Sequence, residues 1–118
     1  MIFVVHEHHA SHLHCDLRLE MDGTLKSWAV PKEPPLQEGV KRLAIQVDDH
    51  ALPYAKFEGE IKVGYGKGIV KIWDSGIYEI EDKTPEKIVF NLKGKRMKGT
   101  YVLLKFKKAK DGWLLFKK

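Results

Sequence analysis

Five of the six histidines lie within residues 6–14, directly before and within a strictly alternating segment. From residue 13 to residue 20 apolar and polar residues alternate, and successive side chains of a β-strand point to opposite faces. One face of this predicted strand therefore carries His14, Asp16 and Arg18, spaced about 6–7 Å apart. A His and an Asp at this spacing can hold one divalent metal ion, and the guanidinium can hold an anion that the metal also contacts. The pattern predicts a site for phosphate chemistry.

A metal ion needs at least three protein ligands to be held against water, and this strand supplies two. We expect the third from residues 6–12, which we interpret as a loop. The candidates are His8 and His12, followed by His6 and His9. Two imidazoles and one carboxylate suit Mn²⁺, Fe²⁺, Co²⁺, Ni²⁺ or Zn²⁺ better than Mg²⁺ or Ca²⁺, and three ligands leave positions open for water and substrate. The alternative is a histidine-rich surface turn without a metal.

Residues 42–50 form a second alternating segment. The face expected to meet the core carries Leu43, Ile45 and Val47, and the opposite face carries Arg42, Ala44, Gln46, Asp48 and His50. If this polar face meets Arg18 in the mouth of a barrel, the site gains a second guanidinium for phosphate recognition. It also gains an imidazole that can donate a proton or stabilise charge. The alternatives are an ordinary exposed arginine and a hydrogen-bonded turn histidine.

Short strands that alternate with Gly- and Pro-containing turns predict an all-β fold, a compact antiparallel β-barrel with at most short helical turns. The predicted strands are 13–20, 25–30, 42–50, 69–73, 77–80, 88–92, 100–107 and 113–116. Predicted turns are Asp22-Gly23, Asp74-Ser75-Gly76, residues 94–99 and Asp111-Gly112, with a stiff loop at Pro31–Pro35 and one helical turn near residues 37–41. Residues 1–118 are expected to form a single domain.

Composition indicates the cellular location and the kind of partner to expect for this domain. No apolar run approaches the ~20 residues that span a bilayer, and the first residues lack the features of a signal peptide, so we expect a cytoplasmic protein. The single Cys15 permits no internal disulfide and is expected to be a buried apolar residue rather than a catalytic thiol. The net charge is +5, and residues 87–118 hold 11 of the 21 basic residues but one of the 16 acidic residues. This asymmetry predicts a nucleic-acid partner.

The motifs in combination match a known pattern. The sequence H-x-A-x-x-L-H-x-D-x-R-L-E is complete over residues 8–20. Further matches are Leu25-Lys26-Ser27-Trp28-Ala29-Val30-Pro31-Lys32, Arg42-Leu43-Ala44, Asp49-His50-x-Leu52-x-Tyr54, Phe57-Glu58-Gly59-x-Ile61 and Tyr65-Gly66-x-Gly68. The chain thereby resembles the 3′-phosphoesterase domain of bacterial DNA ligase D and its stand-alone archaeal and bacterial relatives.

The resemblance implies a compact β-barrel that acts on the 3′ end of a primer strand in a DNA or RNA-terminated primer–template. It implies removal of a 3′-terminal ribonucleoside and then of the 3′-phosphate, which restores a 3′-OH for non-homologous end joining. Manganese is the implied metal, with Co²⁺, Ni²⁺ or Zn²⁺ as other transition metals of the same kind. The implied metal ligands are His8, His14 and Asp16, so His8 is selected over His12. The implied contacts to the scissile phosphate are Arg18, Lys32, Arg42 and His50, with Tyr54 in the same pocket.

These assignments predict metal-assisted hydrolysis in which the cationic side chains neutralise charge in the transition state. One alternative is a metal-stabilised nucleic-acid-binding module without catalysis, and another is a non-haem iron oxygenase with His14, Asp16 and His50 as its ligands. The primer–template is expected to bind Lys93, Lys95, Arg96 and Lys98. We further expect a monomer that works with a separate DNA ligase and end-joining proteins, without a membrane.

Overall fold

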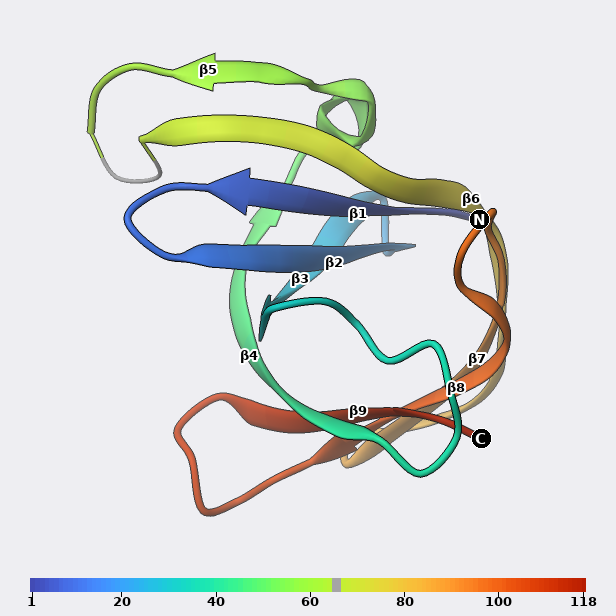
Figure 1. The fold of residues 1–118 in the computed structure, drawn as a ribbon. Helices are drawn as coiled ribbons and strands as arrows, with labels where there is room; N and C mark the ends of the chain where they lie inside the picture. The colour runs from blue at the N-terminus through green and yellow to red at the C-terminus, as the bar shows by residue number, and fades with distance from the viewer. Residues whose placement is uncertain (65–66) are drawn as a thin grey trace.

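The computed structural model describes residues 1–64 and 67–118, so Tyr65 and Gly66 of the family-like motif lie outside the described residues. Strands β1 and β6 pair with each other as well as with their other neighbours, which closes eight antiparallel strands into a barrel (Figure 1). The ninth strand, β5, pairs with the first part of β6 outside the barrel. This arrangement confirms the predicted antiparallel barrel.

The elements occur in the following order along the chain. The strands are β1 (Ile2–His9), β2 (Leu13–Met21), β3 (Thr24–Pro31), β4 (Lys41–His50), β5 (Gly59–Ile61), β6 (Gly68–Thr84), β7 (Lys87–Lys93), β8 (Lys98–Lys105) and β9 (Gly112–Lys117). A short 3₁₀ helix, η1 (Leu52–Lys56), follows β4. Among the described residues no helix has the length and apolar character needed to cross a membrane.

The interior of the barrel is filled by the apolar face of each strand. On β2 the inward residues Cys15, Leu17 and Leu19 are buried with 1 % exposure or less, which confirms the predicted faces of this strand. Inward aromatic side chains from the other walls, among them Trp28 and Tyr101, complete the core. Burial raises the pKa of Cys15 to about 12, so this thiol stays protonated and serves as an apolar core residue. The polar residues of β2 therefore lie on the outer face.

The predicted hairpin turns between β2 and β3 and between β8 and β9 are confirmed. Asp22 and Gly23 both have positive φ angles, 54° and 78°, between the paired residues Met21 and Thr24. This is the backbone that a two-residue turn needs to match the twist of its strands. Asp111, with φ 55°, precedes Gly112 in the second turn.

The predicted inward face of β4 is wrong. Ala44 is fully buried, whereas Leu43 is 37 % exposed. Pairing with β9 explains the reversal, because Ala44 lies opposite the inward Trp113 and Leu43 lies opposite Leu114 on the outer face. Because apolar side chains also lie on the outer face of this wall of the barrel, the alternation along β4 does not show which face meets the core.

The alternation of β4 also changes phase before His50. Val47 pairs with Ser27, but His50 pairs with Leu25, so three residues of β4 match two residues of β3. Such a bulge reverses which side chains face outward. His50 therefore lies on the outer face, whereas Arg42 keeps the inward phase of Ala44. The prediction that Arg42 and His50 share one strand face is wrong.

The predicted hairpin within residues 69–80 is wrong, because β6 is one continuous strand of 17 residues. The carboxylate of Asp74 accepts hydrogen bonds from the backbone N–H groups of Lys95, Arg96 and Met97 in the connection between β7 and β8. These bonds hold the Asp-Ser-Gly segment against the connection between β7 and β8, and the segment stays extended instead of forming a hairpin turn. In Figure 1, β6 crosses beside β1 and then bends down toward β7.

The single helical turn predicted near residues 37–41 is also wrong. Glu38 in that segment forms an isolated parallel bridge with Lys117. The helical turn of the described chain is η1, which begins after the extended residue Ala51 and has a proline in its first turn. Proline suits this position because its missing N–H would have no partner there.

Candidate active site

Three potential metal ligands lie together on the outer face of the hairpin formed by β1 and β2. His8 pairs directly with His14 across the two strands, and their rings lie 4.8 Å apart. One ligand atom from each of His8, His14 and Asp16 lies within 4.8 Å of the others. The predicted loop over residues 6–12 is therefore wrong for its first part, because β1 extends to His9. The alternation of inward and outward side chains along β1 continues through the histidines and places His8 on the outer face.

The donor set fits a divalent transition metal. His14 Nε2 lies 3.5 Å from Asp16 Oδ2, and ligand atoms on one ion with bonds of about 2.1 Å are separated by about 3–4 Å. Small side-chain rotations would therefore bring the three donors onto one ion. Asp16 is buried and His14 is partly exposed, so a substrate can approach from the side of His14. His12 is exposed and lies outside the group, so geometry selects His8 in agreement with the family resemblance.

The ionisation of Asp16 favours cation binding. Burial would raise the pKa of Asp16, but the hydrogen bond with His14 and the charge of Arg18 outweigh burial and lower it. The pKa of His14 is raised, mainly by its hydrogen bond with Asp16. Asp16 is thus a carboxylate at neutral pH, which is the form that binds a metal ion.

Arg18 is buried beside Asp16 and held on three sides. Its Nη2 donates to Asp16 Oδ2 at 3.3 Å, and its Nη1 donates to Ser27 Oγ at 2.9 Å. Its Nε donates to His6 Nδ1 at 2.9 Å, and its Cζ lies 5.0 Å from the centre of the Tyr54 ring. The residue is 4 % exposed. A positive charge fixed in this way needs little reorganisation when negative charge develops nearby.

His6 is a site residue whose place the sequence reasoning missed. It is fully buried, and its Nε2 lies 3.1 Å from the carbonyl oxygen of Phe57. Burial and then the charge of Arg18 lower the pKa of His6 to about 4, so this imidazole is neutral at neutral pH. The alternation of Val4, His6 and His8 on one strand is the signal that could have identified it.

The end of β4 and the η1 helix that follows it bring two predicted residues, His50 and Tyr54, close to Arg18. The His50 and Tyr54 rings stack with centres 4.3 Å apart, and Tyr54 stacks on Phe57 at 5.1 Å. Burial and then Arg18 lower the pKa of His50. This aromatic stack covers the guanidinium, and only the bulge in β4 allows His50 to join it.

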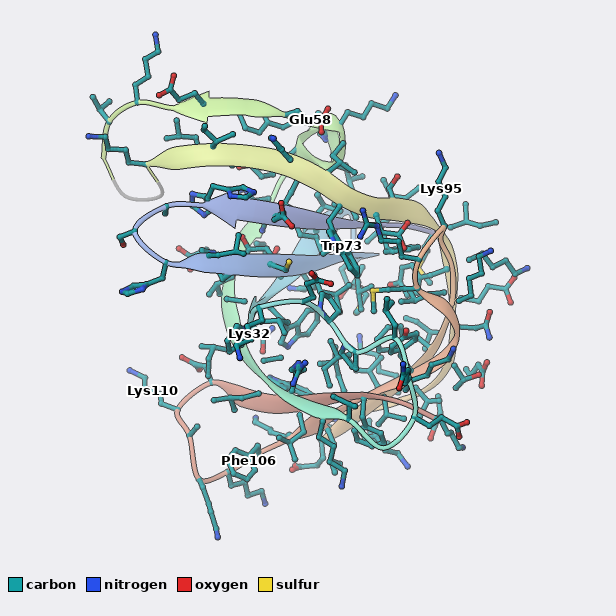
Figure 2. All side chains as sticks on the ribbon, viewed as in Figure 1. Lys32, Glu58, Trp73, Lys95, Phe106 and Lys110 are labelled. Atoms are coloured by element: carbon teal, nitrogen blue, oxygen red, sulfur yellow. The ribbon has the colours of Figure 1, made fainter. Side chains whose placement is uncertain are left out.

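Lys32 and Arg42, also predicted as phosphate contacts, lie at the connection between β3 and β4. Both line a hollow of about 440 Å³ formed by the connection between β3 and β4. Arg42 Nε donates to the carbonyl oxygen of Glu33 at 3.2 Å. Figure 2 shows Lys32 where β3 ends and β4 passes. Lys32 directly follows Pro31, which pairs with His14, so the chain links this hollow to the metal-ligand hairpin. Within the described residues, neither cation hydrogen-bonds to Arg18 or Asp16.

The predicted nucleic-acid-binding residues Lys93, Lys95, Arg96 and Lys98 lie in and beside the connection between β7 and β8. Asp74 anchors this connection, and Arg96 Cζ lies 4.7 Å from the centre of the Trp73 ring. Figure 2 shows Trp73 within the ring of strands, Lys95 projecting outward, and Lys110 in a separate connection. Asp74 pairs with Val5, three residues before His8, which corresponds to roughly 10 Å along the strand.

Comparison with known proteins gives one consistent result. A family profile described as the DNA Ligase D 3′-phosphoesterase domain matches residues 6–105. The chain is 49 % identical over 117 residues to the multifunctional non-homologous end joining protein LigD of Mycobacterium bovis. It is 46 % identical over 123 residues to the protein of that name from Pseudomonas aeruginosa. These matches cover 95 % and 98 % of this chain but 15 % of each relative.

Proposed function

The chain belongs to the DNA ligase D 3′-phosphoesterase domain family, and from this premise we propose that it is a manganese-dependent 3′-end-healing phosphoesterase. It removes a 3′-terminal ribonucleoside and then the 3′-phosphate from a primer strand, leaving a 3′-OH for end joining. The observation that carries the proposal is the His8, His14 and Asp16 group with Arg18 fixed beside it. Because the chain spans about 15 % of the length of its relatives, their other activities are not transferred to it.

The proposed chemistry divides among the residues of the site. His8, His14 and Asp16 would hold a divalent cation, which supplies polarisation of a phosphoryl oxygen and an acidified water when bound. Arg18 stabilises negative charge from its fixed position beside Asp16. His50 either donates a proton to the leaving oxygen or stabilises the charge on the phosphoryl group. The family resemblance adds Lys32 and Arg42, whose hollow adjoins the hairpin through Pro31.

We also propose the setting of this activity. Residues 1–118 act as one 3′-phosphoesterase domain, monomeric and cytoplasmic, on DNA or RNA-terminated primer–templates. A separate DNA ligase and end-joining proteins would use the 3′-OH that it produces. The names of the relatives place those proteins in non-homologous end joining, which supports this setting.

The proposal is tested with 5′-labelled primer–templates that end in a 3′-phosphate or in one ribonucleotide. Incubation with Mn²⁺ is expected to convert both primers to a 3′-OH product, and excess EDTA is expected to stop the reaction. Binding without any metal-dependent product would favour the non-catalytic nucleic-acid-binding module. Dioxygen consumption with Fe²⁺ and a 2-oxoacid would instead identify an iron oxygenase.

The role of His50 is resolved by changing the leaving group. His50→Ala is expected to slow removal of the natural 5′-linked ribonucleoside about 10²-fold or more, because an alkoxide needs a proton as it leaves. A p-nitrophenyl ester of the same 3′-phosphate should be affected far less, because nitrophenolate leaves without protonation. Comparable losses on the two substrates would reject the acid role and leave charge stabilisation. His12→Ala, which changes an exposed histidine of the same region, is the control.

The basic connection between β7 and β8 is tested by a variant in which Lys93, Lys95 and Lys98 are replaced by Gln. Arg96 is kept because it packs on Trp73. If these lysines hold the primer–template, DNA binding weakens and its salt dependence flattens by about one unit of slope for each phosphate that is no longer neutralised. The maximal rate at saturating DNA should remain close to that of the parent.

The matched control for this variant carries Gln at Lys107, Lys108 and Lys110. It removes the same charge from the connection between β8 and β9. Fluorescence anisotropy at several salt concentrations compares the two variants. Equal weakening would indicate that only the overall charge matters, and unchanged affinity in the first variant would show that its lysines only aid solubility.

A further inference from the structure

Arg18 owes its fixed orientation to a residue on the neighbouring strand. We infer that His6 is a positioning residue, a neutral imidazole that holds the Arg18 guanidinium against Asp16 and ties it to the segment carrying Tyr54. This inference rests on the proposed function, because the orientation of Arg18 matters for the charge that phosphoester cleavage develops. His6 itself touches neither substrate nor metal in this role.

The hydrogen bonds of His6 define its tautomer. The Phe57 carbonyl can only accept, so His6 Nε2 carries the proton and donates to it across 3.1 Å. The other ring nitrogen, Nδ1, then has a free lone pair and accepts from Arg18 Nε at 2.9 Å. An imidazole protonated on both nitrogens could not accept this bond. His6 therefore joins Arg18 to the backbone of Phe57 only as a neutral ring.

This bond supplies the third point that sets the plane of the guanidinium. Asp16 and Ser27 engage the two terminal nitrogens, and His6 engages Nε on the remaining edge. Without an acceptor there, a buried Nε–H would lack a hydrogen-bond partner, which is unfavourable. The side chain would then rotate to find one and leave Asp16. We therefore expect loss of His6 to act on catalysis through Arg18.

His6 also links Arg18 to the aromatic stack. Phe57 is the C-terminal cap of η1 and stacks on Tyr54. The His6 ring meets the Tyr54 ring edge-on, with centres 5.1 Å apart. The imidazole thus lies where β1, β2 and the η1 segment meet, and it contacts residues of both β2 and the η1 segment.

Two substitutions separate hydrogen bonding from packing at this position. His6→Gln keeps an acceptor for Arg18 Nε and a donor for the Phe57 carbonyl, so its turnover on the 3′-phosphate primer should stay within about threefold of the parent. His6→Leu fills the space without either bond and should lower kcat about 10–100-fold, the usual cost of removing such an orienting partner. The KM for the primer and the bound Mn²⁺ per chain should be unchanged in both variants. His9→Gln, at an exposed position on the same strand, is the matched control.

A measurement independent of activity tests the same bond. In ¹⁵N-labelled metal-free protein, a scalar coupling across the hydrogen bond should connect Arg18 Nε with His6 Nδ1, and it should disappear in His6→Leu. If the parent has no phosphoesterase activity, the proposed function fails and this coupling alone decides whether His6 holds Arg18. Equal activity of the Leu and Gln variants, loss of Mn²⁺ from His6→Leu, or absence of the coupling in the parent would each overturn the inference.

Discussion

His14→Ala and Asp16→Asn are each expected to lower metal-dependent removal of the 3′-phosphate on the order of 10³-fold or more while the barrel stays folded. Both side chains lie on the outer face of β2, whereas Cys15 and Leu17 from the same strand fill the core. Either change removes one of three potential ligands, so the remaining two would hold a metal ion poorly. Bound manganese per chain should fall together with the rate.

Asparagine is chosen at position 16 because Asp16 also pairs with Arg18. Asp16→Ala would leave a buried guanidinium without its counter-charge, which costs about 3–5 kcal/mol and confuses loss of metal with loss of fold. Asn keeps an oxygen that can accept from Arg18. Thermal melting by circular dichroism checks the fold, and His12→Ala is the control with near-parental activity. Substantial Mn²⁺-dependent turnover in Asp16→Asn would argue against this ligand set.

Arg18→Lys is expected to reduce turnover on the order of 10²-fold, the usual cost of removing one charge-stabilising donor. Lysine keeps the positive charge, but a single ammonium cannot reproduce the planar fork of donors that Arg18 directs to His6, Ser27 and Asp16. Metal content should be retained, because the three ligands remain. The measurement is single-turnover cleavage of the 3′-phosphate primer at saturating Mn²⁺, together with metal analysis.

Arg42→Lys provides the matched comparison for this variant. Arg42 donates a hydrogen bond to the carbonyl oxygen of Glu33, which an ammonium can replace. We expect a smaller loss than in Arg18→Lys. Similar losses in the two variants would mean that general positive charge, rather than the fixed geometry around Arg18, supports the reaction. If the Arg18→Lys protein bound no metal, the role of Arg18 would be to organise the metal ligands rather than to stabilise charge.

Features that depend on residues close in sequence were predicted correctly. The alternation over residues 13–20 placed Asp16 and Arg18 on one face and Cys15 in the core, as the structure shows. The Asp22-Gly23 pair specified its turn, because both positions need positive φ angles that these residues tolerate. The family-like motif selected His8 as the third potential ligand, and the structure places His8 beside His14 and Asp16; their role as metal ligands stays a prediction.

Features that depend on the partner strand were missed or reversed. The inward face of β4 follows from Ala44 lying opposite Trp113, which the local pattern of Leu, Ile and Val contradicts. Asp74 looked like a turn residue, but its carboxylate binds the backbone of a connection more than twenty residues later in the chain. In each case the deciding contact is distant in sequence, so composition and spacing carry no trace of it.

The candidate site shows the same difference between features set by nearby residues and features set by distant ones. By itself the sequence determined which side chains β2 presents outward and what chemistry they offer, because a strand's alternation is a property of its own backbone. Only the tertiary structure decided that a bulge turns His50 to the outer face, that His6 supports the Arg18 guanidinium, and that Lys32 and Arg42 line one hollow. Those outcomes depend on register between strands, and register is set by packing across the whole barrel.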